Sequence, residues 1–376
     1  MNVPFVDLRA QHQSLKTDID AVLQRILDSS QFILGPDLEE FERALATYVG
    51  VGHAVGVGSG TAALTLALQA AGIGAGDEVI TPVNTYIATC EAIVRAGATP
   101  RWVDANPHTH NIDVSQIEGA ITSRTKAIVP VHLYGQPADM TAVMQIAQRH
   151  GLNVIEDCAQ SIGARWQGQQ TGTFGHAGCF SFFPAKNLGA CGDAGGVVTN
   201  DAELAARVRM LRNHGQRERN VHVIDGGCDR MDNLQAAILR VKLPHVDDWN
   251  ARRRAAARRY IELLADVPGV VLPATATDAE PVYHLFVVQV PDRDRTQQQL
   301  GERGIQTGIH YPTPVHEQPV YAHFGYKAED FPIASRLGRR ILSLPMFPEL
   351  RHEQIEYVAD ALKEIVTATA VTGIAG

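Results

Sequence analysis

Cysteine is scarce in this sequence, and no two cysteines stand close together. The 376 residues include five cysteines without a C-x-x-C motif: Cys90, Cys158, Cys179, Cys191 and Cys228. Structural zinc sites and disulfide-stapled small domains both need closely spaced or numerous cysteines. We therefore expect no metal site, and we expect reduced thiols, as is usual in a cytoplasmic protein.

Long apolar runs are also missing. No stretch of about 18 apolar residues occurs, which excludes an ordinary transmembrane helix. The first residues, MNVPFVDLRAQHQ, lack the basic and then apolar layout of a secretory signal. Both absences favour a cytoplasmic location and argue against a membrane partner.

No segment concentrates charge of one sign. The net charge is −8, and the charged residues, 20% of the chain, are spread along it. A nucleic acid is therefore not the expected partner. The tightest basic cluster lies in an alanine-rich helical pattern, and we predict that it forms a solvated helix face: Arg252, Arg253, Arg254, Arg258 and Arg259.

The chain is too long for one small core. A length of 376 residues with 45% hydrophobic residues is typical of an enzyme with two domains. A helical stretch over 233–265 is interrupted at Pro244, where we expect a kink. The boundary is predicted there, giving a large domain over 1–245 and a smaller C-terminal α+β domain over 246–376.

Strand-like and helix-like segments alternate through the first domain. Near-continuous apolar strands separated by helices indicate a mostly parallel sheet covered on both faces. Ligands of such sheets bind at the carboxyl ends of the strands. The strand-like segments are HAVGV, EVITPV, TPRWVDA, KAIVPVHL and LNVIED, followed by GCFSFF and GGVVTN.

One strand leads into GVGSGTAAL, residues 56–64. A glycine-rich turn that opens a helix offers backbone N–H groups to an anion such as a phosphate. It also looks like a dinucleotide fingerprint, because Asp77 lies about 20 residues on. However, Asp77 precedes a strand where a ribose-binding acid should end one, which disfavours a nicotinamide cofactor. A plain tight turn remains an alternative.

Two charged residues stand at the ends of later strands. Asp157 ends the run LNVIE, and Lys186 follows CFSFF, 29 residues further on. Alone, the aspartate could cap the next segment and the lysine could reach solvent. Together with the glycine-rich turn they suggest pyridoxal phosphate, which needs a phosphate cradle, a partner for its protonated ring nitrogen and an amine for a Schiff base. Tyr86 could stack on the ring or be a core aromatic.

Several motifs resemble those of the DegT/StrS (DegT/DnrJ/EryC1/StrS) family of nucleotide-sugar aminotransferases, which are fold type I pyridoxal phosphate enzymes. In chain order they are GSGTAAL, TPVNTYIATCEAI, VHLYGQPADM, VIEDCAQSIGA, GCFSFFPAKNLGACGDAGG, RMDNLQAAILRVKL and IHYPTPVHEQP. The resemblance implies an α/β fold whose large domain has a mostly parallel seven-stranded sheet between helices, beside a smaller α+β domain. It also implies a homodimer with active sites at the subunit interface.

The resemblance implies a role for each matching residue. Lys186 would carry the cofactor as a Schiff base, and Asp157 would bind the pyridine nitrogen. Gln160 would lie beside the ring and Tyr86 would stack on it. The phosphate would be held by Gly60, Thr61 and Ser181. Relatives that dehydrate sugars have histidine in place of the lysine, so Lys186 favours transamination, with L-glutamate as donor and pyridoxamine phosphate as the aminated form.

The sugar is predicted from weaker patterns. NLGACGDAGG resembles enzymes that aminate C3 of dTDP- or UDP-linked 3-keto sugars, while C4 amination, a keto-cyclitol substrate and a non-catalytic cofactor-binding regulator are the alternatives. The substrate candidates are His310, Tyr311, His316 and Phe183, the last replacing a tyrosine common in C3 enzymes. Cys228 replaces an asparagine that in the family reaches the partner's phosphate, so we expect that contact to be lost.

Overall fold

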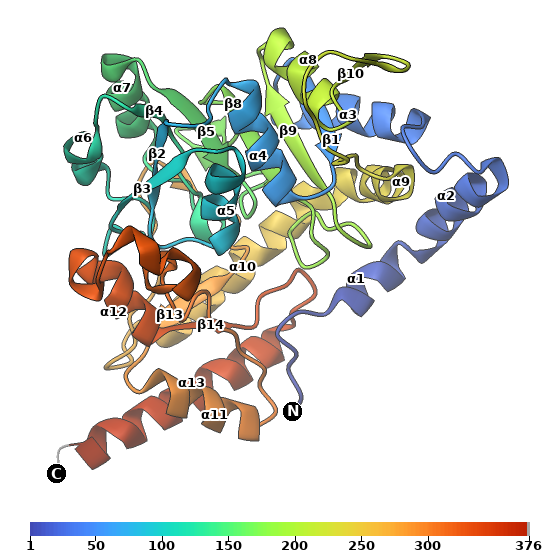
Figure 1. The fold of residues 1–376 in the computed structure, drawn as a ribbon. Helices are drawn as coiled ribbons and strands as arrows, with labels where there is room; N and C mark the ends of the chain where they lie inside the picture. Colours follow the sequence, from blue (N-terminus) through green and yellow to red (C-terminus); the bar gives the residue numbers. More distant parts are fainter. Residues whose placement is uncertain (374–376) are drawn as a thin grey trace.

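The computed structural model describes residues 1–373 and has a seven-stranded sheet at its centre (Figure 1). The strand order is β1-β9-β8-β5-β4-β2-β3, and β9 alone runs antiparallel to its neighbours. The predicted mostly parallel seven-stranded sheet is therefore confirmed. Its strands are β1 (His53–Val57), β2 (Glu78–Pro82), β3 (Thr99–Val103), β4 (Thr125–Ile128), β5 (Asn153–Asp157), β8 (Ala177–Ser181) and β9 (Gly195–Thr199).

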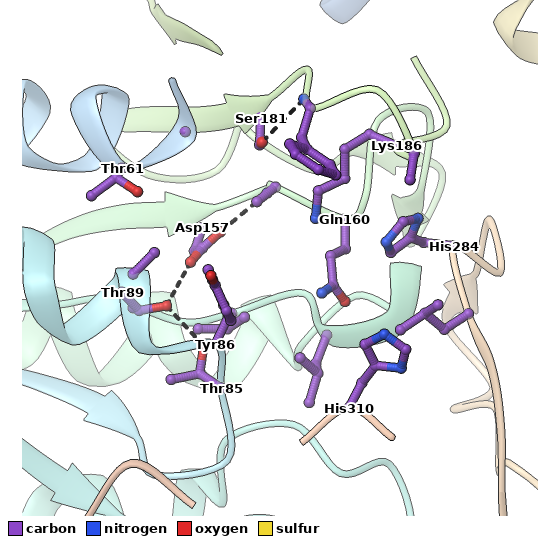
Figure 2. Close-up of a pocket in the computed structure, with 18 of the residues that line it drawn as sticks. Thr61, Thr85, Tyr86, Thr89, Asp157, Gln160, Ser181, Lys186, His284 and His310 are labelled. Atoms are coloured by element: carbon purple, nitrogen blue, oxygen red, sulfur yellow. Dashed lines mark hydrogen bonds between the residues drawn. The ribbon is translucent and has the colours of Figure 1, made fainter. Parts of the chain in front are cut away.

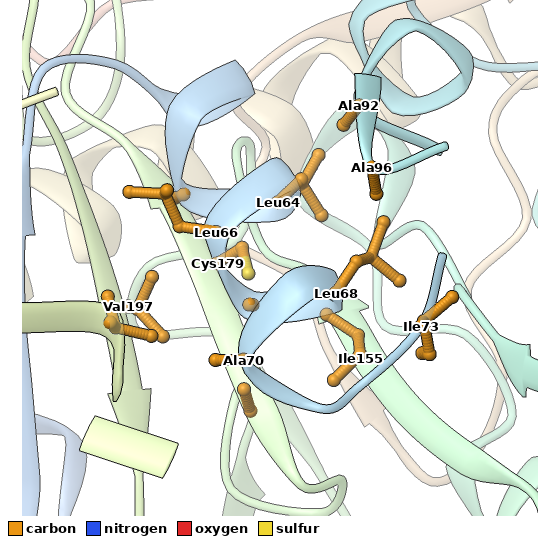
Figure 3. Packing of buried hydrophobic residues seen from close by; sticks show 14 of the residues in the cluster. Leu64, Leu66, Leu68, Ala70, Ile73, Ala92, Ala96, Ile155, Cys179 and Val197 are labelled. Carbon is orange, nitrogen blue, oxygen red and sulfur yellow. The ribbon is translucent and has the colours of Figure 1, made fainter. Parts of the chain in front are cut away.

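Helices cover both faces of the sheet because successive strand residues point to opposite sides. On one face, α4 (Gly60–Ala70) packs Leu64 and Leu68 among α5 (Ile87–Arg95), α8 (Ala202–Leu211) and the strand residue Ile155 (Figure 3). On the other face, Phe41 of α3 (Pro36–Val49) and Leu239 of α9 (Asn233–Lys242) join one core. These layers bury the sheet and leave only its strand ends for a ligand.

The C-terminal part has its own core. The long helix α10 (Val246–Leu264) packs with α11 (Arg293–Glu302), α13 (His352–Gly373) and the antiparallel pair β13 (Phe286–Gln289) and β14 (Ile341–Leu344). Val3 belongs to this core and forms a bridge with Ile305. The kink expected at Pro244 is confirmed, since a 3-10 turn (Leu243–His245) separates α9 from α10.

The remaining elements are shorter or lie at the periphery, and Figure 1 shows α1 and α2 extending away from the sheet. They are α1 (Leu8–Ser14), α2 (Lys16–Ser29), α6 (Ile117–Ala120), α7 (Met140–His150), α12 (Pro332–Arg340), β6 (Arg165–Trp166), β7 (Gln169–Gln170), β10 (Gln216–Glu218), β11 (Val221–His222), β12 (Ala279–Glu280) and the 3-10 turns Val114–Gln116, Leu133–Gly135, Val315–Glu317, Pro319–Phe324 and Ala328–Asp330. Within residues 1–373, none of the helices combines the length and apolar character that a membrane span needs.

Two local expectations are wrong. The strand predicted over 126–133 ends at Ile128, because Pro130 has no N–H to give to a ladder. Arg253 does not lie on a solvated face of α10. It is 2% exposed and its guanidinium donates to three backbone carbonyls of the C-terminal core, so the helix turns this one arginine inward.

Candidate active site

A cavity of about 450 Å³ lies where the carboxyl ends of β1, β5 and β8 meet the C-terminal part (Figure 2). Parallel strands bring their carboxyl ends to one edge, so residues far apart in sequence share this space. Most of the predicted site residues line it: Gly60, Thr61, Tyr86, Asp157, Gln160, Ser181, Phe183, Lys186, His310 and Tyr311.

One wall of the cavity is the first turn of α4. The Ser59 hydroxyl accepts the N–H of Ala62 at 3.1 Å and so caps the helix. The remaining first-turn N–H groups have no intrahelical acceptor and attract an anion. A Cβ on Gly60 would lie 2.6 Å from the Cβ of Ser181, so only glycine lets β8 approach the helix this closely. The Ser181 hydroxyl and the first N–H groups of α4 thus form a site that can hold a phosphate.

Asp157 forms the floor of the cavity. Its carboxylate accepts from the Thr89 hydroxyl at 2.8 Å and from the N–H of Ala159 at 3.1 Å. Burial raises the pKa of Asp157 because the ionised form loses water. No side-chain cation makes an ion pair with it among residues 1–373. A protonated ring nitrogen is the partner that would relieve this cost.

Lys186 reaches the cavity from the loop that follows β8. The turn is closed by the Lys186 N–H donating to the Phe183 carbonyl at 2.8 Å. Burial lowers the pKa of the Lys186 amine to about 8, and the charge of Asp157 opposes that shift. An amine with this pKa is partly neutral at neutral pH and can attack a carbonyl. Lys186 thus points into the cavity rather than to solvent, and its amine has the pKa that a nucleophile needs.

The C-terminal part supplies the opposite wall. The Gln160 amide accepts from the N–H of Tyr134 at 2.6 Å and donates to the Tyr311 hydroxyl at 3.2 Å. The rings of Tyr86 and Tyr311 lie 5.2 Å apart. His310 bonds to Ser343 at 2.8 Å, and burial lowers its pKa to about 4. The sheet-containing part and the C-terminal part thus both contribute polar groups to one cavity.

The prediction for His316 needs correction. Its ring is buried and lies 4.8 Å from the ring of Phe331, outside the cavity. A side chain with 0% exposure cannot meet a substrate that enters from solvent. It packs its own 3-10 turn, Val315–Glu317, against Phe331 at the start of α12, so the structure gives it a place in the core.

Several cavity residues were not predicted. Thr85 and Thr89 share a hydrogen bond at 2.8 Å and lead to Asp157, but two threonines carry no distinctive signal in the sequence. His284 also lines the cavity. It interrupts the apolar run VYHLFVV, and a polar residue within a buried strand pattern is a signal that could have indicated it.

One further cluster has the residue types of a metal site. Donor atoms of His132, Glu156 and Cys158 lie within 4.8 Å of one another. Glu156 already accepts N–H groups from the 172–175 turn, and both ring nitrogens of His132 have hydrogen bonds. These hydrogen bonds connect β5 to its neighbouring loops, which gives the cluster a structural role.

The residues around the cavity fit pyridoxal phosphate. The close approach at Gly60 leaves an anion cradle, and the buried carboxyl of Asp157 calls for a cation. A partly neutral amine, that of Lys186, lines the same cavity. These three groups match the phosphate, the ring nitrogen and the aldehyde of that cofactor.

Known proteins resemble this chain over nearly its whole length. The model of the DegT/DnrJ/EryC1/StrS aminotransferase family matches residues 13–363. The erythromycin biosynthesis sensory transduction protein EryC1 of Saccharopolyspora erythraea is 50% identical over 363 residues, covering 96% of this chain and 99% of the relative. The dTDP-3-amino-3,4,6-trideoxy-alpha-D-glucose transaminase of Streptomyces venezuelae is 49% identical over 362 residues, 96% of each protein. The crystal structure of S. venezuelae DesV in complex with a ketimine intermediate has a TM-score of 0.95 and 48% identity, covering 97% of this chain and 98% of that one.

Proposed function

Because the chain belongs to the DegT/DnrJ/EryC1/StrS aminotransferase family, we propose that it transfers an amino group to C3 of a nucleotide-linked 3-keto sugar. The observation that carries the transferase chemistry is the meeting of Lys186, Asp157 and the α4 N-terminus in one cavity. The C3 position rests on the full-length similarity to a relative that is named as a 3-amino sugar transaminase. L-Glutamate is the proposed amino donor.

The protein is a pyridoxal-phosphate-dependent aminotransferase. When bound, the cofactor supplies an aldehyde for an amine and a ring that accepts electrons from the carbon losing a proton. We assign the phosphate to Gly60, Thr61 and Ser181, and the ring nitrogen to Asp157. Tyr86 is assigned to the face of the ring. The side chain of Gln160, which is fixed by Tyr134 and Tyr311, is assigned to the position beside the ring.

Lys186 is the proposed general base and acid. Its partly neutral amine takes the proton from the α-carbon of the donor. In the second half reaction the same nitrogen delivers a proton to the sugar carbon that receives the amino group. Asp157 would stabilise a positive charge on the ring nitrogen of the bound cofactor, and that charge favours the release of the α-proton.

The keto sugar is assigned to the side of the cavity formed by His310, Tyr311 and Phe183. The Phe183 ring, 52% exposed, has no hydroxyl for a sugar, so hydrogen bonds must come from the other two residues. We propose that the protein works in the cytoplasm, in accord with its free cysteines.

A homodimer is part of the proposal. Large apolar side chains are exposed around the cavity mouth and along the N-terminal helices, and such exposure is typical of a surface that another chain covers. The exposed residues are Leu27, Phe32, Ile33, Leu34, Tyr86 and Phe183. Cys228 is exposed and its sulfur accepts from the Arg230 guanidinium at 2.9 Å, so we do not assign it a phosphate contact.

The regulator alternative is supported by the names of two relatives, the Saccharopolyspora protein and a pleiotropic regulatory protein of Geobacillus stearothermophilus. A protein that only sensed the cofactor would not need an amine held at a pKa of about 8 next to a substrate-sized cavity. The lysine therefore favours catalysis.

The test is a panel of 3-keto and 4-keto dTDP- and UDP-sugars, together with a keto-cyclitol, each incubated with L-[15N]glutamate. We expect label at C3 of a 3-keto substrate, read by NMR, and no product with Lys186→Ala, because that variant has no base. The control variant Lys327→Ala changes an exposed lysine and should keep full activity. Label only at C4, or only on a keto-cyclitol, would refute the C3 assignment.

A further inference from the structure

A chain of buried amides leads from the catalytic loop to one ring nitrogen of His284. Asn187, the residue after Lys186, is 2% exposed, and Asn250 of α10 is 1% exposed. The Asn250 amide donates to the Ile162 carbonyl at 2.9 Å. A carbonyl only accepts, so this bond fixes which end of the Asn250 amide is its oxygen.

The orientation of Asn187 follows from that bond. Its NH2 group donates to the Asn250 oxygen at 2.7 Å and to the Val282 carbonyl at 3.1 Å. Both donor hydrogens are then used, and the Asn187 oxygen faces Nδ1 of His284 at 3.1 Å. An oxygen cannot donate, so Nδ1 of His284 must carry the hydrogen.

The backbone of His284 is fixed as well. Arg253 donates to the carbonyls of Tyr283, His284 and Met346 at 3.3, 3.3 and 3.0 Å. A buried arginine that spans these carbonyls holds the segment before β13 against the rest of the core. The ring therefore has a fixed position in addition to a fixed tautomer.

The other nitrogen of the ring is free for the cavity. Burial lowers the pKa of His284, and the charges of Lys186, Arg253 and His310 lower it further, so the ring is neutral. Nε2 then has a lone pair and, within the described chain, no hydrogen-bond donor. Figure 2 shows the ring beside the Lys186 side chain, and both residues line the cavity.

In the structure Lys186 and His284 line the same cavity without a hydrogen bond between them. We propose that His284 is a positioning residue whose Nε2 accepts an N–H hydrogen bond from Lys186 when that amine is free of the cofactor, carries a proton and has turned toward the ring. The proposal rests on the role of Lys186 given above. During turnover the released amine must stay within reach of the reacting carbon in a largely apolar space. A fixed acceptor limits its rotation and stabilises it once it has taken a proton.

The tautomer is measured first, in the apoprotein. Long-range 1H–15N NMR of protein labelled with 15N-histidine distinguishes rings with hydrogen on Nδ1 from rings with hydrogen on Nε2. The signal of His284 is assigned as the one that disappears in the His284→Gln variant. Neutron diffraction of the unaltered apoprotein gives the same answer without a variant. We expect a neutral ring with hydrogen on Nδ1 at pH 7.5. Hydrogen on Nε2, or a cationic ring, would overturn the proposal.

A matched pair of variants tests the contact with Lys186. His284→Asn keeps a polar group near Nδ1 and loses the atom at Nε2, whereas His284→Gln carries an amide oxygen to the Nε2 position. The titration midpoint of Lys186 is read in the apoprotein from reductive methylation against pH, with peptide mass spectrometry. We expect it to fall by about one pH unit in the asparagine variant, because the ammonium loses its acceptor, and by less in the glutamine variant.

Kinetics separate positioning from folding. The half reaction with glutamate should slow at least about tenfold in His284→Asn and recover in part in His284→Gln, while cofactor affinity stays within about twofold. The exposed His323→Asn is the control and should behave like the unaltered protein. Equal midpoints in all variants, or equal losses in both His284 variants, would refute the role. A protein with the expected tautomer and midpoints that aminates no keto sugar would refute the proposed function instead.

Discussion

At the scale of single residues, burial sets the chemistry of the site. Asp157 and Lys186 both lose water in the same cavity, but the loss acts on them in opposite directions. The pKa of the aspartate rises and that of the lysine falls to about 8, because the charged form is disfavoured in each case. Asp157 can therefore pair with a cation, and Lys186 can attack a carbonyl carbon.

The pH dependence of cofactor capture follows from the lysine. Only the neutral amine attacks an aldehyde, and its fraction grows about tenfold per pH unit below the pKa. We expect apoprotein to capture pyridoxal phosphate about ten times faster at pH 7 than at pH 6 and to level off above about 8, as followed by visible absorbance. A rate that continues to climb to pH 10 would show an unperturbed lysine.

At the scale of elements, the anion cradle depends on how closely β8 approaches α4. Leu64 and Leu68 fix the helix on the sheet, and Gly60 and Ser181 then determine whether a phosphate fits (Figure 3). Packing and function are coupled here, because the same helix is a core element and an anion site.

Gly60→Ala tests this coupling. The new Cβ would lie 2.6 Å from Ser181, so helix and strand must separate, at a cost of about 1–3 kcal/mol. We expect a lower melting temperature and at least about tenfold weaker cofactor binding, measured by calorimetry and absorbance titration. Gly119→Ala, where nothing lies within 4 Å, is the matched control and should change neither. Unchanged binding in the Gly60 variant would remove this helix start from the phosphate site.

At the scale of the whole molecule, the cavity lies where the two cores meet. Exposed apolar side chains occur at the cavity, at Tyr86 and Phe183, and in the N-terminal segment, at Leu27 and Phe32. A second copy of the chain would cover them and would bring new groups to the site. The proposed homodimer would shield these side chains, because Phe32 and Tyr86 are exposed to water in a single chain.

The double variant Leu27→Glu with Phe32→Glu tests the interface. Two buried charges would oppose association, so we expect monomers in light scattering and loss of transamination. Val320→Glu changes a residue that is 60% exposed on the C-terminal part and should leave the dimer intact. A double variant that remains dimeric would place the interface elsewhere.

Much of this protein could be predicted from its sequence. Apolar strands between helices predicted the parallel sheet, and Asp157, Lys186 and the turn at Gly60 each stand at a strand end. Because parallel strands end at one edge, their order along the chain was enough to bring these residues together. These three features already suggested the cofactor, and the motif resemblance added the family.

Only the tertiary structure decided the rest, because it depends on which side chains meet across domains. His316 stands in a motif but faces Phe331, and Arg253 lies in a basic run but turns inward to backbone carbonyls. The tautomer of His284 follows from the amides of Asn250 and Asn187, which precede it in the chain by 34 and 97 residues. Sequence periodicity reports which face of an element is apolar, whereas the hydrogen bonds of buried polar groups depend on every element packed around them.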